Sequence, residues 1–172
     1  MPWEKDELVP LRALANPLRI RIVSLLTGAS MSATEVAREL DIAHASASYH
    51  LRQLADAGFL EQVDERPSPG GKGRPQRRYR YNSSSGARID RSGGRHLYDA
   101  LFTDLARRLE QARDRRMSMD AEVWLDRSVW EEVVGLISQA VAVVHDKAQP
   151  PRSADSVKVS MTALLLEMGD DR

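Results

Sequence analysis

The chain has 172 residues, and its 25 lysine and arginine residues balance 25 acidic ones, so it is not a polycation that binds any anionic surface through bulk charge. It contains no cysteine, which excludes disulfides, thiolate zinc sites, iron–sulfur clusters and cysteine nucleophiles. No apolar run approaches the roughly 20 residues that a membrane-spanning helix needs, and the opening residues lack the apolar core of a signal peptide. We therefore expect a cytoplasmic protein with no membrane partner.

The first third of the chain predicts two short helices. Asn16 is a good N-cap and Pro17 suits the first position of a helix, where its missing N–H costs nothing. Ser32 and Glu35 have the spacing of a capping box and predict the start of a second helix. Residues 41–43 ("DIA") then predict a short turn.

The stretch "HASASYHLRQL", residues 44–54, predicts a third helix with two different faces. At 100° per residue, Ala47, Leu51 and Leu54 share the face that points toward the core. The remaining side chains are small or polar, which lets a helix approach base edges in a DNA major groove. Such a face is also typical of a helix that is merely solvated or packed against a close neighbour. The candidate DNA-contacting residues of this helix are His44, Ser46, Ser48, Tyr49, Arg52 and Gln53.

Two strands are predicted next because the period of the apolar residues changes, with Leu60 and Val63 in residues 59–66 and Tyr79 and Tyr81 in residues 76–82. The segment between them, "PSPGGKGRP", is too rich in turn residues for a helix and predicts an exposed hairpin tip. Lys72, Arg74 and Arg77 lie in or beside this tip and are candidate phosphate contacts. Two helices, a tight turn, a third helix and a basic hairpin follow the order of a winged helix-turn-helix, in which one helix enters the major groove and another braces it.

The segments "LRALANPLRIRIVSLL", "SATEVARELDIAHASASYHLRQLADAGFLEQVDE" and "GRPQRRYRYN" resemble the ArsR-type (arsenic-repressor-like) winged-helix regulators of bacteria over about residues 8–82. The resemblance implies a homodimeric transcription factor, most often a repressor, that binds double-stranded DNA at a partly palindromic operator. It assigns Ser46, Ser48, Tyr49, His50 and Arg52 to the recognition helix, and Lys72 and Arg74 to the wing.

The sequence departs from the family pattern at two places. Ala43 replaces the serine that many members have before the recognition helix, so a side-chain cap and its phosphate contact are missing. The cysteines of metal-sensing members are absent, which excludes thiolate sensing. His96 and Asp99 have the spacing of some zinc sites, but two ligands are too few. We predict no metal site and no cofactor, and we leave a small-molecule effector open as a partner.

The other histidines and serines do not predict an enzyme. Ser48 and His50 are two positions apart on a helix and diverge by about 200°, and no glycine-rich phosphate loop precedes a helix. His50 lies beside the core stripe and is expected to pack there, whereas His44 begins the helix and can approach a phosphate. The alternative function is a ligand-binding or protein-interaction module that uses its winged helix to dock a protein partner.

The C-terminal half predicts a linker at residues 83–94, a dimerisation helix at 95–117 and a small β-α-β unit at 118–172. Its strands are expected at 121–126 ("AEVWLD") and 157–168 ("VKVSMTALLLEM"), around a helix that begins with a capping box of Ser128 and Glu131. This unit is expected either to cap the dimer, with Trp124 and Trp130 in its core, or to bind a small apolar ligand. The predicted dimer seam consists of Tyr98, Leu101, Phe102, Leu105 and Leu109. The expected fold class is thus mainly α with a small β component (α+β).

Overall fold

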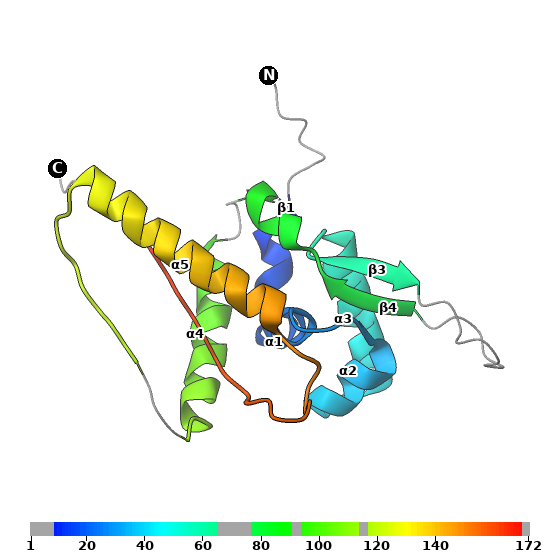
Figure 1. The fold of residues 1–172 in the computed structure, drawn as a ribbon. Coiled ribbons are helices and arrows are strands. Elements are labelled where there is room, and N and C mark those ends of the chain that lie inside the picture. Colours follow the sequence, from blue (N-terminus) through cyan, green and yellow to red (C-terminus); the bar gives the residue numbers. More distant parts are fainter. Residues whose placement is uncertain (1–8, 65–76, 91–93, 114–116, 170–172) are drawn as a thin grey trace.

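Three helices and a small sheet form the N-terminal part of the computed structural model, which describes residues 9–64, 77–90, 94–113 and 117–169 (Figure 1). The helices are α1 (Pro17–Leu26), α2 (Ala33–Leu40) and α3 (His44–Asp56), and the strands are β2 (Met31–Ser32), β3 (Leu60–Asp64) and β4 (Arg77–Tyr81). This order confirms the predicted fold class, which is mainly helical with a small antiparallel sheet in the winged helix-turn-helix arrangement.

The predicted caps set the ends of the first two helices. The Asn16 side chain accepts hydrogen bonds from the N–H groups of Leu18 (2.9 Å) and Arg19 (3.3 Å). Ser32 and Glu35 form the predicted capping box, because the Ser32 hydroxyl accepts from the Glu35 N–H and the Glu35 carboxylate accepts from the Ser32 N–H. Asp41 ends α2 in the left-handed conformation, with φ of 52°. The tight turn between α2 and α3 follows from these local preferences.

The three-stranded sheet has the order β2-β4-β3, with both pairings antiparallel. In this register Tyr79 of the central strand lies beside Met31 of β2 and Gln62 of β3. The sequence predicted β3 and β4 but not β2, because two residues are too few to show an alternating pattern. The predicted hairpin tip at 67–75, with Lys72 and Arg74, lies outside the described residues.

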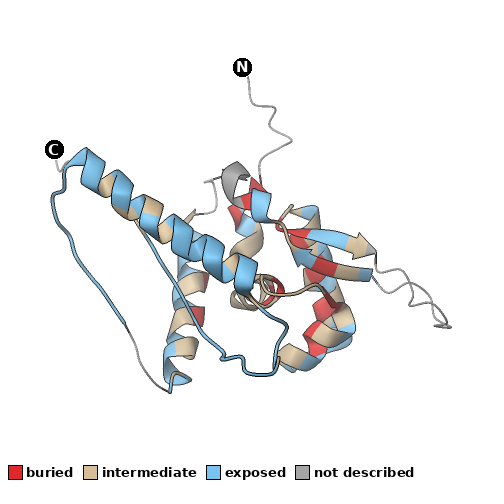
Figure 2. Cartoon of the chain, in the orientation of Figure 1, coloured by how far each residue is buried: buried red, intermediate tan, exposed pale blue. Residues whose placement is uncertain are grey.

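The hydrophobic core lies between the three helices and the sheet, where the buried residues concentrate in Figure 2. Ala47, Leu51 and Leu54 of α3 are completely buried, as the helical periodicity predicted. Gly58, with φ of 82°, turns the chain from α3 into β3. A side chain at Gly58 would be strained in this conformation and would crowd Val9.

The predicted linker at residues 83–94 is wrong over most of its length. The structure places a 3-10 helix, η3 (Ser83–Arg88), and a short strand, β5 (Ile89–Asp90), in this segment. β5 pairs in parallel with β1 (Val9–Pro10), which leads into the 3-10 helix η2 (Leu11–Leu14). This strand pair joins segments about eighty residues apart. Its two-residue strands leave no periodic pattern in the sequence.

Helix α4 (Gly94–Glu110) is shorter than the predicted helix at 95–117 and packs on α1 and η2. It ends earlier because the predicted apolar stripe has no large side chain after Leu109. Its buried residues are Ala100 and Asp104, and the Asp104 carboxylate forms ion pairs with Arg107 and Arg108 of the same helix. Of the predicted dimer seam, Tyr98, Phe102 and Leu109 are exposed, and Leu101 and Leu105 are half-buried.

The predicted β-α-β unit is corrected by the structure, which contains its helix but not its strands. Helix α5 (Arg127–Lys147) is present and has no buried residue (Figure 2). Residues 121–126 and 157–168 form no strand, because neither segment has a hydrogen-bonded strand neighbour within the described chain.

The predicted capping box of α5 is also wrong. The helix begins at Arg127, so Ser128 already lies in the first turn and Asp126 occupies the cap position without a side-chain hydrogen bond. Trp124 is 94% exposed in the single chain, so it does not lie in a core there.

Candidate nucleic-acid interface

Helix α3 presents the face that the sequence analysis assigned to DNA. His44, Tyr49 and Arg52 are exposed, and Tyr49 is exposed to 48%. The structure therefore places the buried stripe and the predicted contact residues on different sides of one helix. Of the remaining predicted contacts on α3, Ser46, Ser48 and Gln53 are half-buried at the flanks.

His50 is packed at the edge of this helix, as predicted. The Arg19 Nε of α1 donates a hydrogen bond to His50 Nδ1 at 3.3 Å, and Arg19 Nη1 donates to the Ala13 carbonyl at 3.0 Å. The Tyr49 and His50 rings meet edge to face, with centroids 5.2 Å apart. Burial and the positive charge of Arg19 lower the pKa of His50, so the imidazole is held neutral and accepts through Nδ1. This contact braces α3 against α1.

The start of α3 lacks a side-chain cap. Ala43 has the extended backbone of an N-cap residue (φ −61°, ψ 139°), but its methyl group accepts no hydrogen bond. The amide groups of the first turn therefore receive no acceptor from the cap residue. A phosphate oxygen at this helix start would supply one, together with favourable charge at the positive end of the helix.

The arginines of β4 divide into structural and outward-facing groups. Arg78 donates to the Ser30 carbonyl at 2.7 Å and forms an ion pair with Glu35 at 2.9 Å, so it ties the sheet to the capping box of α2. Arg80 pairs with Glu61 across the strands. Arg77 is exposed and lies at the end of β4 that leads to the hairpin tip. Among the predicted wing cations, Arg77 is therefore the one that the structure places.

The pKa of Glu35 reflects the same arrangement. Burial alone would raise the pKa, but hydrogen bonds from Ser32 and the charge of Arg78 outweigh it and lower the pKa below its usual value. The carboxylate therefore stays ionised while it caps α2 and binds β4. Sequence reasoning found the capping box but missed the ion pair, because 43 residues separate its two members.

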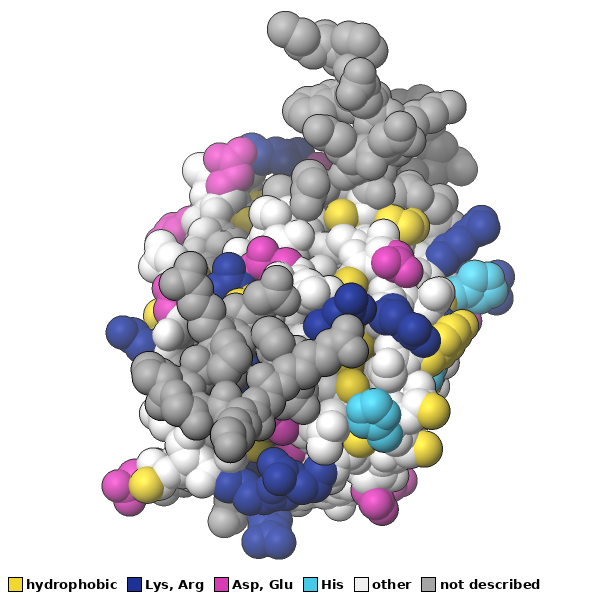
Figure 3. Space-filling model, turned by 90° about the vertical axis from the view of Figure 1, so that its right-hand side faces the viewer, with side chains coloured by type: hydrophobic (Ala, Val, Ile, Leu, Met, Phe, Trp, Pro, Cys, Tyr) yellow, Lys and Arg dark blue, Asp and Glu magenta, His cyan; other side chains and the backbone are white. Residues whose placement is uncertain are grey.

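Figure 3 views the molecule from the right-hand side of Figure 1, where α2, α3, β3 and β4 lie. Lys and Arg side chains occupy the middle and the lower part of this face, with exposed histidines nearby. Acidic side chains are also present, so the face is mixed in charge rather than uniformly basic. Contacts to an anionic partner therefore depend on particular cations.

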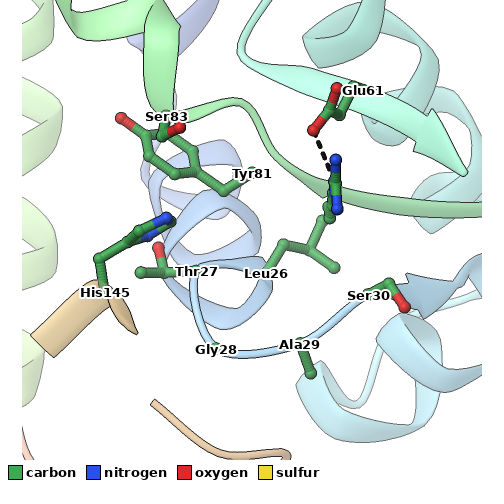
Figure 4. A pocket seen from close by; sticks show the side chains of 10 residues that line it. Leu26, Thr27, Gly28, Ala29, Ser30, Glu61, Tyr81, Ser83 and His145 are labelled. Carbon is green, nitrogen blue, oxygen red and sulfur yellow. Dashed lines mark hydrogen bonds and ion pairs between the residues drawn. The ribbon is translucent and has the colours of Figure 1, made fainter. Parts of the chain in front are cut away.

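A polar cavity of about 350 Å³ lies where α5 meets the winged helix (Figure 4). Its walls include Thr27, the Glu61–Arg80 ion pair, Tyr81 and His145 of α5. The His145 ring meets Tyr81 edge to face, and its buried Nδ1 has no hydrogen-bond partner among the described residues. This lining suits a small polar molecule better than an apolar one. The predicted effector stays a prediction.

The described residues hold no group of three or more His, Asp and Glu side chains with the spacing of a metal site. None of the helices that the structure describes is long and apolar enough to cross a membrane.

Comparison with known proteins identifies the N-terminal part. Residues 14–63 match the model of a helix-turn-helix domain. No curated protein matches the chain.

Solved structures also match the chain, and three of them match with low TM-scores. One is a possible transcriptional regulator for arsenical resistance, with 28% identity over 60% of this chain and 96% of that chain, and a TM-score of 0.39. The second is RV1404 from Mycobacterium tuberculosis, with 15% identity, coverage of 80% and 76%, and a TM-score of 0.32. The third is Bacillus subtilis PadR in complex with operator DNA, with 15% identity, 81% of each chain covered and a TM-score of 0.35. The family model and the geometry described above together identify residues 14–63 as a helix-turn-helix domain.

Proposed function

We propose that this protein is a DNA-binding transcriptional regulator that acts as a homodimeric repressor on a partly palindromic operator. The observation that carries the proposal is the two-sided surface of α3. Its apolar stripe is completely buried, while the side chains of Tyr49 and Arg52 are exposed on the face that points away from the protein.

The exposed face of α3 has the chemistry of a recognition helix. The major groove is about 12 Å wide and admits one helix, and small residues such as Ala45 and Ser48 let that helix approach base edges closely. Arg52 can donate two hydrogen bonds to a guanine, and Gln53 can form a paired contact with an adenine. Tyr49 and the helix start at His44 are placed to contact bases or backbone phosphates.

The wing supplies sequence-independent affinity in this proposal. Arg77 at the end of β4, with Lys72 and Arg74 of the hairpin tip, binds phosphates beside the groove that α3 occupies. Such contacts release condensed counterions, so binding weakens steeply as salt rises.

Dimerisation places two recognition helices on one face of the DNA, with half-sites about 34 Å apart, one helical turn. The exposed apolar residues of α4 support this part of the proposal, because Tyr98, Phe102 and Leu109 follow one stripe of the helix and remain uncovered in the single chain. Leu101 and Leu105 border that stripe.

A mobility-shift assay on the DNA upstream of the protein's own gene, at two salt concentrations, tests the proposal. We expect Arg52→Ala and Tyr49→Ala to change the preference among operator variants, with a loss of about 1–3 kcal/mol at the base that each contacts. Arg95→Ala removes an equal charge from an exposed site on α4 and is the matched control. A protein that shifts no DNA at low salt would contradict the proposal and favour a module that docks a protein partner.

A further inference from the structure

Two segments that flank α5 have the sequence pattern of amphipathic strands. In the first arm, residues 117–125, each odd position is apolar and the even positions are polar apart from Trp124. The second arm, residues 157–165, is likewise apolar at each odd position and polar at the even positions up to Thr162. The apolar faces are Met117, Met119, Ala121, Val123 and Leu125 in the first arm, and Val157, Val159, Met161, Ala163 and Leu165 in the second. This period of two is the signature of a strand with one buried face.

Neither arm has a strand partner or a core within the part of the single chain that the structure describes. Met117 is 97% exposed and Val157 is 81% exposed. Among the described residues from Met117 to Met168, seventeen large apolar side chains are exposed, and α5 buries none of its own. These side chains lie on both arms and around α5, and large exposed apolar surfaces are typical of protein–protein interaction sites.

We propose that a second copy of this chain covers this surface, and that the first arm of each copy pairs as a β ladder with the second arm of the other copy. The inference rests on the homodimer of the proposed function and adds how its C-terminal half is built. Paired arms would turn their apolar faces onto the uncovered side of α5 and satisfy backbone N–H and C=O groups that have no ladder partner in the single chain.

Charge favours pairing between unlike arms. The polar face of the first arm carries Asp120 and Glu122, whereas that of the second arm carries Lys158 and no acidic residue. Two first arms in register would place carboxylates beside carboxylates, which is unfavourable across a ladder. A first arm beside a second arm places Lys158 among carboxylates.

Contacts within one chain attach the second arm to α4 and to the start of α5. Arg108 of α4 donates to the hydroxyls of Ser160 (2.8 Å) and Thr162 (3.0 Å), and Glu167 pairs with Arg127 at the start of α5. The second arm therefore crosses between α4 and α5, while the first arm runs along the outer edge of the molecule (Figure 1). No ladder joins the arms within the described chain. The large apolar side chains of both arms remain mostly exposed.

Cysteine cross-linking of the full chain tests the pairing, because the protein has no cysteine of its own. The probes are Glu122→Cys in the first arm and Ser160→Cys in the second, made singly and together. A bismaleimide that spans about 8 Å reaches both direct and diagonal cross-strand neighbours. Asp56→Cys, at an exposed site on α3, is the control for random collisions.

We expect the double variant, and the two single variants when co-expressed, to run as a covalent dimer on a denaturing gel. Each single variant alone, and the Asp56→Cys control, should stay at monomer mass. A double variant that cross-links within one chain, a single variant that links to itself as strongly, or no cross-link at all would each overturn the inference.

A charge reversal gives an independent readout. We expect Lys158→Glu to raise the dimer dissociation constant about tenfold, because the change counts twice in a two-fold dimer, and Asp120→Lys in the same chain to restore it. Lys147→Glu, an equal change at the end of α5, should leave the constant unchanged. An unchanged constant in Lys158→Glu would contradict the pairing.

The two proposals fail separately. If light scattering finds a wild-type dimer that shifts DNA while the arms do not cross-link, the arm pairing is wrong and the proposed function stands. A monomer that shifts no DNA overturns both.

Discussion

His50 shows how one side chain couples the recognition helix to its support. Its Nδ1 accepts a hydrogen bond from Arg19, so the contact needs a neutral imidazole. Burial and then the charge of Arg19 lower the pKa of His50 below its ordinary value of 6.5. As the pH falls below 6.5, the unfolded chain therefore binds this proton before the folded chain does. The free energy of unfolding is therefore unaffected by the titration of His50 above pH 6.5, and it decreases as the pH falls from 6.5 through the folded-state pKa.

We expect the thermal midpoint of the wild type to fall between about pH 7 and about pH 5, and to fall less in His50→Gln, whose amide oxygen accepts from Arg19 without titrating. Thermal unfolding at the two pH values measures this difference. His44→Gln is the control, because His44 is exposed on the same helix and should follow the wild type. An equal fall in His50→Gln and the wild type would show that the charge of His50 does not affect stability.

Arg78 and Arg80 lie two positions apart on β4 and both pair with a glutamate, but their surroundings differ. The side chains of Arg78 and Glu35 are 16% and 32% exposed, whereas those of Arg80 and Glu61 are 58% and 45% exposed. Arg78 also donates to the backbone carbonyl of Ser30. A charged hydrogen bond out of solvent is worth more than an exposed ion pair.

We expect Arg78→Ala to lower the free energy of unfolding by about 1.5–3 kcal/mol. Arg80→Ala removes the same charge from the same strand and should cost about 0–1 kcal/mol. Urea unfolding of both variants measures the contrast. Equal losses would mean that burial does not separate the two ion pairs.

At the scale of elements, local sequence predicts the helix-turn-helix well. Asn16, the Ser32–Glu35 pair and the stripe of Ala47, Leu51 and Leu54 all act within one or two helical turns, so their geometry is readable from spacing. They predict the three helices and the buried face of α3 before any tertiary contact is known.

The missed elements depend on distant partners. β5 exists because Val9 lies beside Ile89, and β2 because Met31 lies beside Tyr79. Conversely, residues 157–162 alternate between apolar and polar as a strand does, yet the described part of the chain supplies no strand neighbour for them. A period of two predicts which face of a strand will be buried. It does not predict which backbone will complete the ladder.

The uncapped start of α3 yields a prediction for the element as a whole. Ala43 already has the extended backbone that an N-cap needs, so Ala43→Ser should add a side-chain acceptor without strain. We expect a gain of about 0.5–1 kcal/mol in the free energy of unfolding, measured in urea. Ala45→Ser places the same residue inside the helix, where serine is a poorer helix former than alanine, and should give no gain. Equal gains in the two variants would exclude capping as the cause.

At the scale of the whole molecule, the two halves of the chain differ in how they are stabilised. The winged helix encloses its own core, whereas none of the described residues in α5 and its flanking segments is buried. The ion pair between Arg152 and Glu39 ties the loop after α5 to α2. A second copy would therefore complete the C-terminal half while leaving the DNA-facing side of α3 open.

A homodimer carries two wings, and this doubles the effect of a wing substitution on salt dependence. Each phosphate contact contributes about 0.9 to the slope of the logarithm of affinity against the logarithm of salt concentration. We therefore expect Arg74→Ala to reduce that slope by about 1.8 for a dimer, against about 0.9 for a monomer, and to weaken binding to all DNA sequences alike. Fluorescence anisotropy over a salt series measures the slope, and Arg95→Ala on α4 is the control of equal charge. An unchanged slope would remove the wing from the interface, whereas a change near 0.9 would mean that one copy binds alone. Because a phosphate contact carries no base preference, a shift in operator preference in Arg74→Ala would instead place this side chain at a base edge.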